Sequence, residues 1–166
     1  RSLFPTFGIS VAFAVGGRPV AGGIMLPIGN DLFLAERGGG TFRNGVRQRV
    51  SDVSELSVAR IEVDFSMPPV RDETLARADT ILRTVGQIRC NSSTVVALCA
   101  IVSGDMDGFV EVALWPWDYA AGQVLVEEAG GRASRMDGTD LRLFDGRGGV
   151  LMSNGRLHEE LVRSIK

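Results

Sequence analysis

The sequence lacks the residues on which several common active sites depend. Its 166 residues include one histidine, His158, which lies near the C-terminus beside two glutamates. We expect His158 to be a solvent-exposed helix residue. One peripheral histidine argues against Ser-His-Asp and Cys-His mechanisms and against a metal site with several histidines. Metal chemistry here must therefore use oxygen ligands, which favours Mg²⁺ or Ca²⁺.

Cysteine, lysine and long apolar runs are also scarce. Cys90 and Cys99 are the only cysteines, and they lack C-x-x-C spacing. We expect two buried thiols in a reducing cytoplasm, because neither a disulfide nor a metal site is indicated. No run of about 18 apolar residues predicts a membrane span, and no signal peptide is recognisable. The net charge is −2 and Lys166 is the only lysine, so nothing indicates binding to nucleic acid or to a membrane.

The pattern of apolar residues divides the chain into two parts without a polar linker. In the first third of the chain, apolar and other residues alternate, as is typical of antiparallel strands, and turn signals occur at Gly16–Pro19 and Asn44-Gly45. Strands and helices then alternate. We predict one layered α/β domain over residues 1–166, with an antiparallel meander over 4–51 and an α/β layer over 58–166.

Three elements of the second part are specific expectations. We expect a strand over Ala59–Ser66 and an amphipathic helix over Asp72–Val85 that packs through Leu75, Ile81 and Leu82. "TVVALCAIVSG" is apolar nearly all round. This segment predicts a buried helix that Ser92 or Ser93 caps and that ends at Gly104.

The segment "WPWDYAAGQVLVEEAGG", Trp115 to Gly131, predicts another helix with an unusual start. Asp118 suits the N-cap position, which is a sufficient structural role for a carboxylate there. The large aromatic residues before it and the small Ala120, Ala121 and Gly122 after it also favour a second role. Space beside a carboxylate at a strand-to-helix junction suits a divalent cation or a substrate hydroxyl.

Two further segments have a structural and a functional interpretation. Glu111 lies inside "DGFVEVAL", where it is either a solvent-facing strand residue or a carboxylate that accepts hydrogen bonds from a polyol. "NSST", Asn91 to Thr94, either only caps a helix or also binds an anion or sugar hydroxyls there.

Two motifs that look functional are interpreted as turns. Asp137-Gly138-Thr139 contains D-G-T, but it lies between two expected strands where Asp-Gly favours a hairpin. "ERGGGTFRNG" is glycine-rich, but it matches no nucleotide-binding pattern and a strand follows it.

These segments together resemble the inositol monophosphatase family. "WPWDYAAGQVLVEEAGG" resembles its C-terminal signature, W-D-x-A-A-G followed by an apolar helix and E-A-G-G. "AERGGGTFRNGVRQRVS" and "IRCNSSTVVALCAIVSGDMDGFVEV" resemble two further family segments in the same order. The resemblance covers Phe4 to Ile165.

The resemblance implies an αβαβα sandwich and the Mg²⁺-dependent hydrolysis of a phosphate monoester, above all inositol monophosphate. By position, Asp118 matches a metal ligand that also touches a substrate hydroxyl, and Glu111 matches a substrate-binding glutamate. Ser92, Ser93 and Thr94 match a substrate-contact segment. The family also implies a homodimer.

The sequence departs from the family pattern in two ways. Ser92-Ser93-Thr94 replaces Gly-[Ser/Thr]-Ala. The family's other metal ligands, a helix glutamate and D-P-[IL]-D-G-[TS], are not found, and Arg1 stands about where that motif would end. We expect these residues to lack the N-terminal helices and first strands, to contain no catalytic residue, and to be inactive alone, because one aspartate does not hold Mg²⁺.

Two alternatives remain open. The protein is a non-catalytic homologue or fragment that binds a phosphorylated ligand or a partner, or it is a phosphatase of the same family with another substrate. That substrate would be a sugar bisphosphate, histidinol phosphate or a phosphonucleotide.

Overall fold

The first part of the chain forms a five-stranded antiparallel meander. The computed structural model describes residues 6–64 and 71–165, without the side chains of residues 71 and 73. The strands follow one another across the first sheet in chain order: β1 (Ile9–Val15), β2 (Arg18–Leu26), β3 (Asp31–Glu36), β4 (Gly40–Arg43) and β5 (Val46–Arg47). Asn44 and Gly45 both have positive φ, at 49° and 80°, as a two-residue hairpin turn requires. The glycine-rich segment is the β3–β4 hairpin, as predicted.

The second sheet has the order β7-β6-β8-β10-β9. Its strands are β6 (Arg60–Val63), β7 (Gln87–Arg89), β8 (Gly108–Leu114), β9 (Arg132–Arg135) and β10 (Gly148–Ser153). A short 3₁₀ helix, Leu56–Val58, precedes β6, and another, Leu143–Asp145, lies between β9 and β10. β6 pairs in parallel with β7 and β8, and β10 pairs antiparallel with β8 and β9. Residues 65 and 66 of the strand predicted over 59–66 lie outside the described residues.

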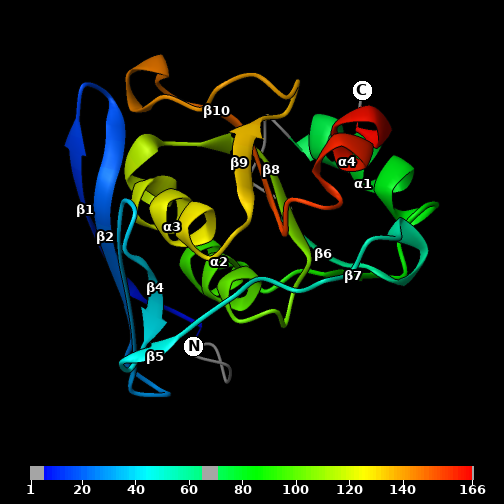
Figure 1. Cartoon of the computed structure of the whole chain (residues 1–166). Helices are drawn as coiled ribbons and strands as arrows, with labels where there is room; N and C mark the ends of the chain where they lie inside the picture. Colours follow the sequence, from blue (N-terminus) through cyan, green and yellow to red (C-terminus); the bar gives the residue numbers. More distant parts are fainter. Residues whose placement is uncertain (1–5, 65–70, 166) are drawn as a thin grey trace.

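The helices complete a layered arrangement (Figure 1). They are α1 (Arg71–Leu82), α2 (Thr94–Val102), α3 (Pro116–Glu128) and α4 (His158–Ser164). α2 and α3 lie between the two sheets in one apolar core, and α1 and α4 cover the other face of the second sheet in another. These are four consecutive layers, β-α-β-α, of the predicted αβαβα order, so the α/β fold class is confirmed. None of the helices in the described ranges has the length and hydropathy that a bilayer crossing demands.

The helices α2 and α3 run in the same direction. Short connections join α2 to β8 and β8 to α3, so the chain reverses at both ends of β8. Gly122 in α3 packs against α2 so closely that a Cβ atom there would lie 2.1 Å from Cδ1 of Leu98. The first turns of both helices therefore lie at the same end of this layer, which we call the helix layer.

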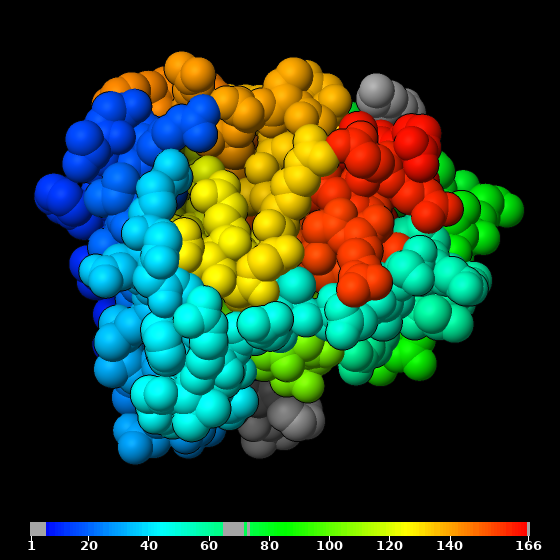
Figure 2. Space-filling model, in the orientation of Figure 1, coloured from blue at the N-terminus to red at the C-terminus, as the bar shows by residue number. Residues whose placement is uncertain are grey.

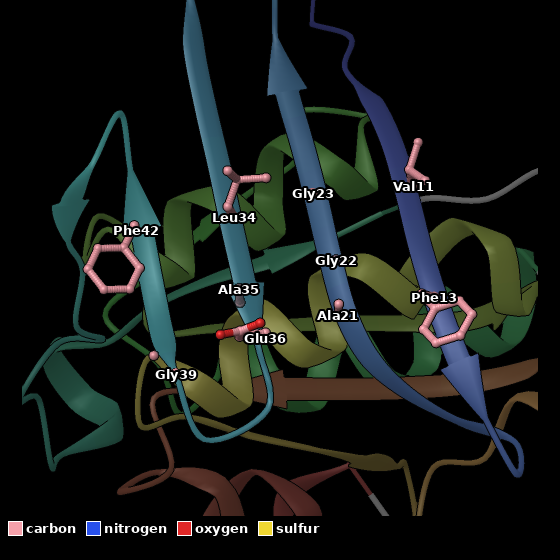
Figure 3. Close-up of a pocket in the computed structure, with 11 residues that line it drawn as sticks. Val11, Phe13, Ala21, Gly22, Gly23, Leu34, Ala35, Glu36, Gly39 and Phe42 are labelled. Atoms are coloured by element: carbon pink, nitrogen blue, oxygen red, sulfur yellow. The ribbon is translucent and has the colours of Figure 1, made fainter.

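The first sheet has a buried inner face and an exposed, apolar outer face. Ile24 and Phe33 point inward and are buried, whereas Val11, Phe13 and Leu34 point outward and are exposed. Figure 3 shows this outer face, where the side chains of β1 and β3 rise on either side of small β2 residues. The depression between them measures about 570 Å³. In the described ranges, no helix covers this face.

An extended segment after β5 ties the two sheets together. Figure 2 shows it crossing the front of the molecule in cyan, from the first sheet to the C-terminal part. Val50 N donates to Ala129 O at 3.2 Å, and Asn154 Nδ2 donates to Val53 O at 2.7 Å. This segment is therefore fixed to both the helix layer and the second sheet.

Two expectations about burial were wrong. In α1, Thr74, Ala78 and Ile81 are buried, whereas Leu75 and Leu82 are exposed. The helix packs through positions spaced by four and three residues, which lie on one face of a helix. Cys90 is an exposed free thiol, and only Cys99 is buried, where burial raises the pKa of its thiol to about 12.

The prediction for His158 was also wrong, because this residue is fully buried. Its Nε2 lies 2.8 Å from Ser134 Oγ and its Nδ1 lies 2.9 Å from Ser153 Oγ. Burial, with the nearby charge of Arg132, lowers the pKa of His158 to about 4. The histidine thus joins β9, β10 and α4 in its neutral form.

Candidate functional site

Asp118 lies in the first turn of α3 and holds the start of that helix. Trp115, with φ −87° and ψ 155°, occupies the N-cap position that we had predicted for Asp118. The helix begins earlier because Pro116 has a preset φ and no N–H to satisfy. Asp118 N donates to Trp115 O at 2.9 Å, and Trp115 N donates to Asp118 Oδ2 at 2.9 Å. One carboxylate oxygen thus has a structural partner, and the side chain is half-buried.

The small residues after Asp118 allow close packing, as predicted. Ala121 and Gly122 are buried between the first sheet and α2. A Cβ atom on Gly22 of β2 would lie 2.9 Å from Ala121 Cα. The absence of side chains on both glycines therefore sets the position of α3, and with it the position of Asp118.

Two tryptophans flank this carboxylate in the chain. The rings of Trp115 and Trp117 stack with their centroids 5.0 Å apart and an interplanar angle of 10°. Trp115 is 43% exposed and Trp117 is 68% exposed. A groove of about 290 Å³ adjoins Trp117, and its lining consists of Ser10, Ala12, Ala14, Pro116, Trp117, Ala120 and Leu143.

Ser92 and Ser93 precede α2, as expected, and Thr94 is the first residue of this helix. Ser93 is the N-cap residue with φ −147°, but its side chain makes no cap hydrogen bond. Ser92 has φ +54°, in the left-handed region that favours glycine. This is the position at which the family pattern has glycine. Ser92 thus has a backbone conformation that glycine adopts readily.

Sequence reasoning missed the residue that holds this segment in place. Glu62 of β6 is 1% exposed. Its Oε1 accepts a short hydrogen bond from Asn91 N, and its Oε2 accepts from Asn91 Nδ2 at 2.8 Å. Burial raises the pKa of Glu62, although both hydrogen bonds act in the opposite direction. A glutamate between apolar neighbours in "RIEV" was the available signal.

Glu111 is buried, so its interpretation as a solvent-facing residue was wrong. It lies in the middle of β8 and is 1% exposed. It alternates with Val110, which faces α1 and α4, and therefore shares with Phe109 the side that faces the helix layer. Its Oε1 accepts a hydrogen bond from Ala113 N at 3.3 Å.

The structure brings the predicted residues to one region without forming a metal centre. Ser92–Thr94 and Asp118 lie at the same end of the helix layer, and Glu111 faces this layer from the strand that connects the two helices. Within residues 6–64 and 71–165, no three His, Cys, Asp or Glu side chains form a group that could hold a metal ion. Asp118 alone therefore does not fit a magnesium site, because Mg²⁺ requires several oxygen ligands.

The D-G-T motif lies outside this region and is a turn, as predicted. Asp137 Oδ1 accepts hydrogen bonds from Thr139 N at 2.9 Å and Thr139 Oγ1 at 2.6 Å. These bonds lower the pKa of Asp137. Gly138 has φ +89°. All of these contacts close the loop after β9.

Comparisons with known proteins agree with the resemblance. A family model described as "Inositol monophosphatase family" matches residues 2–166. Nus factor SuhB of Haemophilus influenzae is 31% identical over 164 residues, and inositol-1-monophosphatase of Mesorhizobium japonicum is 33% identical over 166. The fructose-1,6-bisphosphatase/inositol-1-monophosphatase of Aquifex aeolicus is 34% identical over 165. Each alignment covers 98% of this chain and 61% of the relative.

Solved structures show the same similarity. The extragenic suppressor protein suhB of Bartonella henselae has a TM-score of 0.91 at 33% identity, with 98% of this chain and 63% of that chain covered. Inositol monophosphatase from Anabaena has a TM-score of 0.89 at 33% identity, with 97% and 64% covered. The chain thus spans about three fifths of the length of these proteins.

Proposed function

This chain belongs to the inositol monophosphatase family, and we propose that the protein which contains it hydrolyses a phosphate monoester with Mg²⁺ as cofactor. We propose inositol monophosphate as the substrate. The observation that carries this proposal is the position of Asp118 and Ser92–Thr94 at the same end of the helix layer. Two segments about 25 residues apart in the sequence, both of which match the family's substrate-side motifs, start parallel helices side by side.

The described residues contribute binding and orientation. Asp118 has one oxygen engaged with Trp115 N, and the other would be one ligand of the cation. Glu111 and the hydroxyls of Ser92–Thr94 would hold the alcohol part of the ester. Water supplies the oxygen that forms a bond to phosphorus, and the alcohol leaves with a proton. One carboxylate does not hold Mg²⁺, so activity requires further ligands and these 166 residues alone remain predicted to be inactive.

A homodimer in the cytoplasm is part of this proposal. The exposed apolar outer face of the first sheet supports the formation of a dimer. The two free thiols support a reducing compartment such as the cytoplasm.

A second candidate is a non-catalytic role in binding a phosphorylated ligand or a protein partner. Two observations favour it. The Haemophilus influenzae relative bears the name of a Nus factor rather than of a phosphatase, and Ser92-Ser93-Thr94 departs from the family pattern.

The test is the substitution Asp118→Asn in the full-length protein. The asparagine oxygen still accepts the hydrogen bond from Trp115 N, so the free energy of unfolding should change by no more than about 1 kcal/mol. Mg²⁺-dependent phosphate release from inositol 1-phosphate should fall by about 100-fold or more, because the loss of a metal ligand exceeds the loss of a supporting residue. Asp137→Asn, in the D-G-T turn, is the matched control and should keep full activity.

Three outcomes separate the candidates. Unchanged release in Asp118→Asn would remove this residue from the site. Calorimetric binding of Mg²⁺ and inositol 1-phosphate without turnover would favour the non-catalytic role. Faster release from a sugar bisphosphate, histidinol phosphate or a phosphonucleotide than from inositol 1-phosphate would reassign the substrate within the family.

A further inference from the structure

The segment that leads into β1 contacts the residues at which α2 begins. Thr6 Oγ1 donates a hydrogen bond to Asn91 O at 3.2 Å, although the two residues are 85 positions apart in the sequence. Gly8 packs beside the same helix, because a Cβ atom there would lie 2.9 Å from Cγ2 of Val95, in the first turn of α2. Two independent contacts therefore place residues 6–8 against the start of α2.

Asn91 is held through both of the peptide groups that flank it. Glu62 Oε1 accepts from Asn91 N, which belongs to the peptide group between residues 90 and 91. Thr6 Oγ1 donates to Asn91 O, which belongs to the peptide group between residues 91 and 92. Each peptide group is planar and rotates as a unit. The two contacts together therefore restrain both backbone dihedral angles of Asn91.

The restraint on the second peptide group extends to Ser92. This group includes Ser92 N, so its orientation is linked to the φ of Ser92, which is +54°. A residue with a Cβ atom keeps such a conformation only where the surrounding structure holds it. Glu62 supports the near side of Asn91, and Thr6 supports the side that adjoins Ser92.

The backbone also places the hydroxyl that follows. Ser93 is the N-cap residue of α2, but its side chain makes no cap hydrogen bond. Its position therefore depends on the conformation of the chain before it. A change in the peptide group between residues 91 and 92 would displace the hydroxyls of Ser92–Thr94 together.

We propose that Thr6 is a positioning residue of the proposed site, and that its hydroxyl, through Asn91, holds Ser92–Thr94 in the conformation that binds the alcohol part of the phosphate ester. The inference rests on the proposed function, in which these hydroxyls contact the substrate. Thr6 would act on the binding of the ester and not on the transfer of its phosphoryl group. Its loss should therefore raise KM and leave kcat nearly unchanged.

Steady-state kinetics of the full-length protein with inositol 1-phosphate test this role. Thr6→Val removes the hydroxyl and keeps the branched shape of the side chain. It should raise KM by about 3-fold to 10-fold, the range that corresponds to one hydrogen bond, and change kcat by less than about 2-fold. Thr6→Ser keeps the donor and should retain a KM near that of the wild type.

Thr80→Val is the matched control for the loss of a threonine hydroxyl. Thr80 Oγ1 also donates to a backbone carbonyl at the surface, Ala76 O at 3.3 Å, but it lies on α1, on the other side of the second sheet. This variant should leave KM unchanged. Urea unfolding of each variant shows whether it is folded under the conditions of the assay.

The amide resonance of Ser92 in NMR spectra provides a readout that does not depend on turnover. It should shift in Thr6→Val, because its peptide group loses a hydrogen bond, and stay in place in Thr6→Ser and Thr80→Val. A Ser92 resonance that does not shift, or an unchanged KM in Thr6→Val, overturns the role of Thr6. An equal rise of KM in Thr6→Ser also overturns it, since the hydroxyl would not be the cause. Absence of hydrolysis by the wild type overturns the proposed function, and the Ser92 resonance then decides whether Thr6 holds this segment.

Discussion

The carboxylate of Glu62 holds Asn91 by both its backbone and its side-chain amide. The two oxygens accept from Asn91 N and from Asn91 Nδ2, and the carboxylate is shielded from water. The next residue, Ser92, turns into the left-handed region before α2 begins. A buried residue of β6 thus sets the conformation of the segment that carries the proposed substrate hydroxyls.

The first prediction concerns this pair. Glu62→Gln keeps the size of the side chain but turns an NH₂ group toward one of the two donors of Asn91. We expect a loss of about 1–3 kcal/mol in the free energy of unfolding, because a buried donor loses its acceptor. We also expect a higher KM for the phosphate ester. Urea unfolding and steady-state kinetics measure both.

The control for this variant is Glu159→Gln, which removes the exposed ion pair with Arg132. An exposed pair contributes about 1 kcal/mol or less, and it lies outside the site, so KM should not change. Equal stability and KM in Glu62→Gln and the wild type would show that Asn91 does not depend on this carboxylate.

The second prediction uses the difference between two adjacent serines. Ser92 has φ +54° and Ser93 has φ −147°. Ser92→Gly should raise the free energy of unfolding by about 0.5–1 kcal/mol, because relief of the left-handed conformation outweighs the added chain entropy. Ser93→Gly should not raise it, since no strain exists there. Thermal unfolding of the two variants measures this difference. If neither variant is more stable than the wild type, the assignment of strain to Ser92 is contradicted.

The third prediction is a pH dependence from His158. The folded protein takes up a proton on this residue at a pKa of about 4, well below the ordinary value of 6.5. Between these values the unfolded chain binds more protons, so stability falls as the pH drops through this window and is fully present above pH 6.5. The loss amounts to about 3 kcal/mol. Denaturant unfolding at several pH values measures it.

The hydrogen bonds of His158 explain why protonation is unfavourable. Ser134 Oγ donates its own proton to Arg135 O at 2.6 Å, so the proton between Ser134 and the ring belongs to Nε2. Ser153 Oγ accepts from Gly155 N and donates to Nδ1. A second proton, on Nδ1, would face the hydroxyl proton that Ser153 Oγ donates. His158→Gln should flatten the pH dependence between 6.5 and 4, and parallel curves for the two proteins would contradict this origin.

The fourth prediction concerns the contact between α2 and α3. Gly122→Ala places a methyl group against Leu98, and overpacking of this kind costs about 1–3 kcal/mol. Leu98→Ala alone should cost about 2–5 kcal/mol through the cavity that it leaves. The double variant should cost less than the sum, because each change relieves the other. Urea unfolding of the four proteins gives the coupling, and additive losses would mean that the two residues do not meet.

Local signals predicted much of the fold. Asn44-Gly45 imposed its hairpin, the all-round apolar segment before Gly104 formed the buried helix α2, and Asp137-Gly138 closed a turn. Each of these conformations is determined by a few neighbouring residues, so contacts with distant parts of the chain did not alter the predicted structure.

Residues with distant partners were predicted poorly. His158 is buried because Ser134 and Ser153 reach it from other strands, and nothing within its helix indicates them. Glu62 meets Asn91 only because β6 and β7 pair in parallel. Asp118 was predicted to be an N-cap residue, but α3 begins at Pro116, so Trp115 is the N-cap and Asp118 lies in the first turn.

Phe33 and Leu34 are neighbours in β3 with similar chemistry, yet they lie on opposite faces of the first sheet. Phe33→Ala should lower the free energy of unfolding by about 3–5 kcal/mol, since it empties part of the core. Leu34→Ala should hardly change it. Its effect would instead appear in how the molecules associate, as measured by light scattering or sedimentation. Successive residues of this strand alternate between the core and the outer face. A substitution therefore affects the folding of the molecule at one position and its association with other molecules at the next.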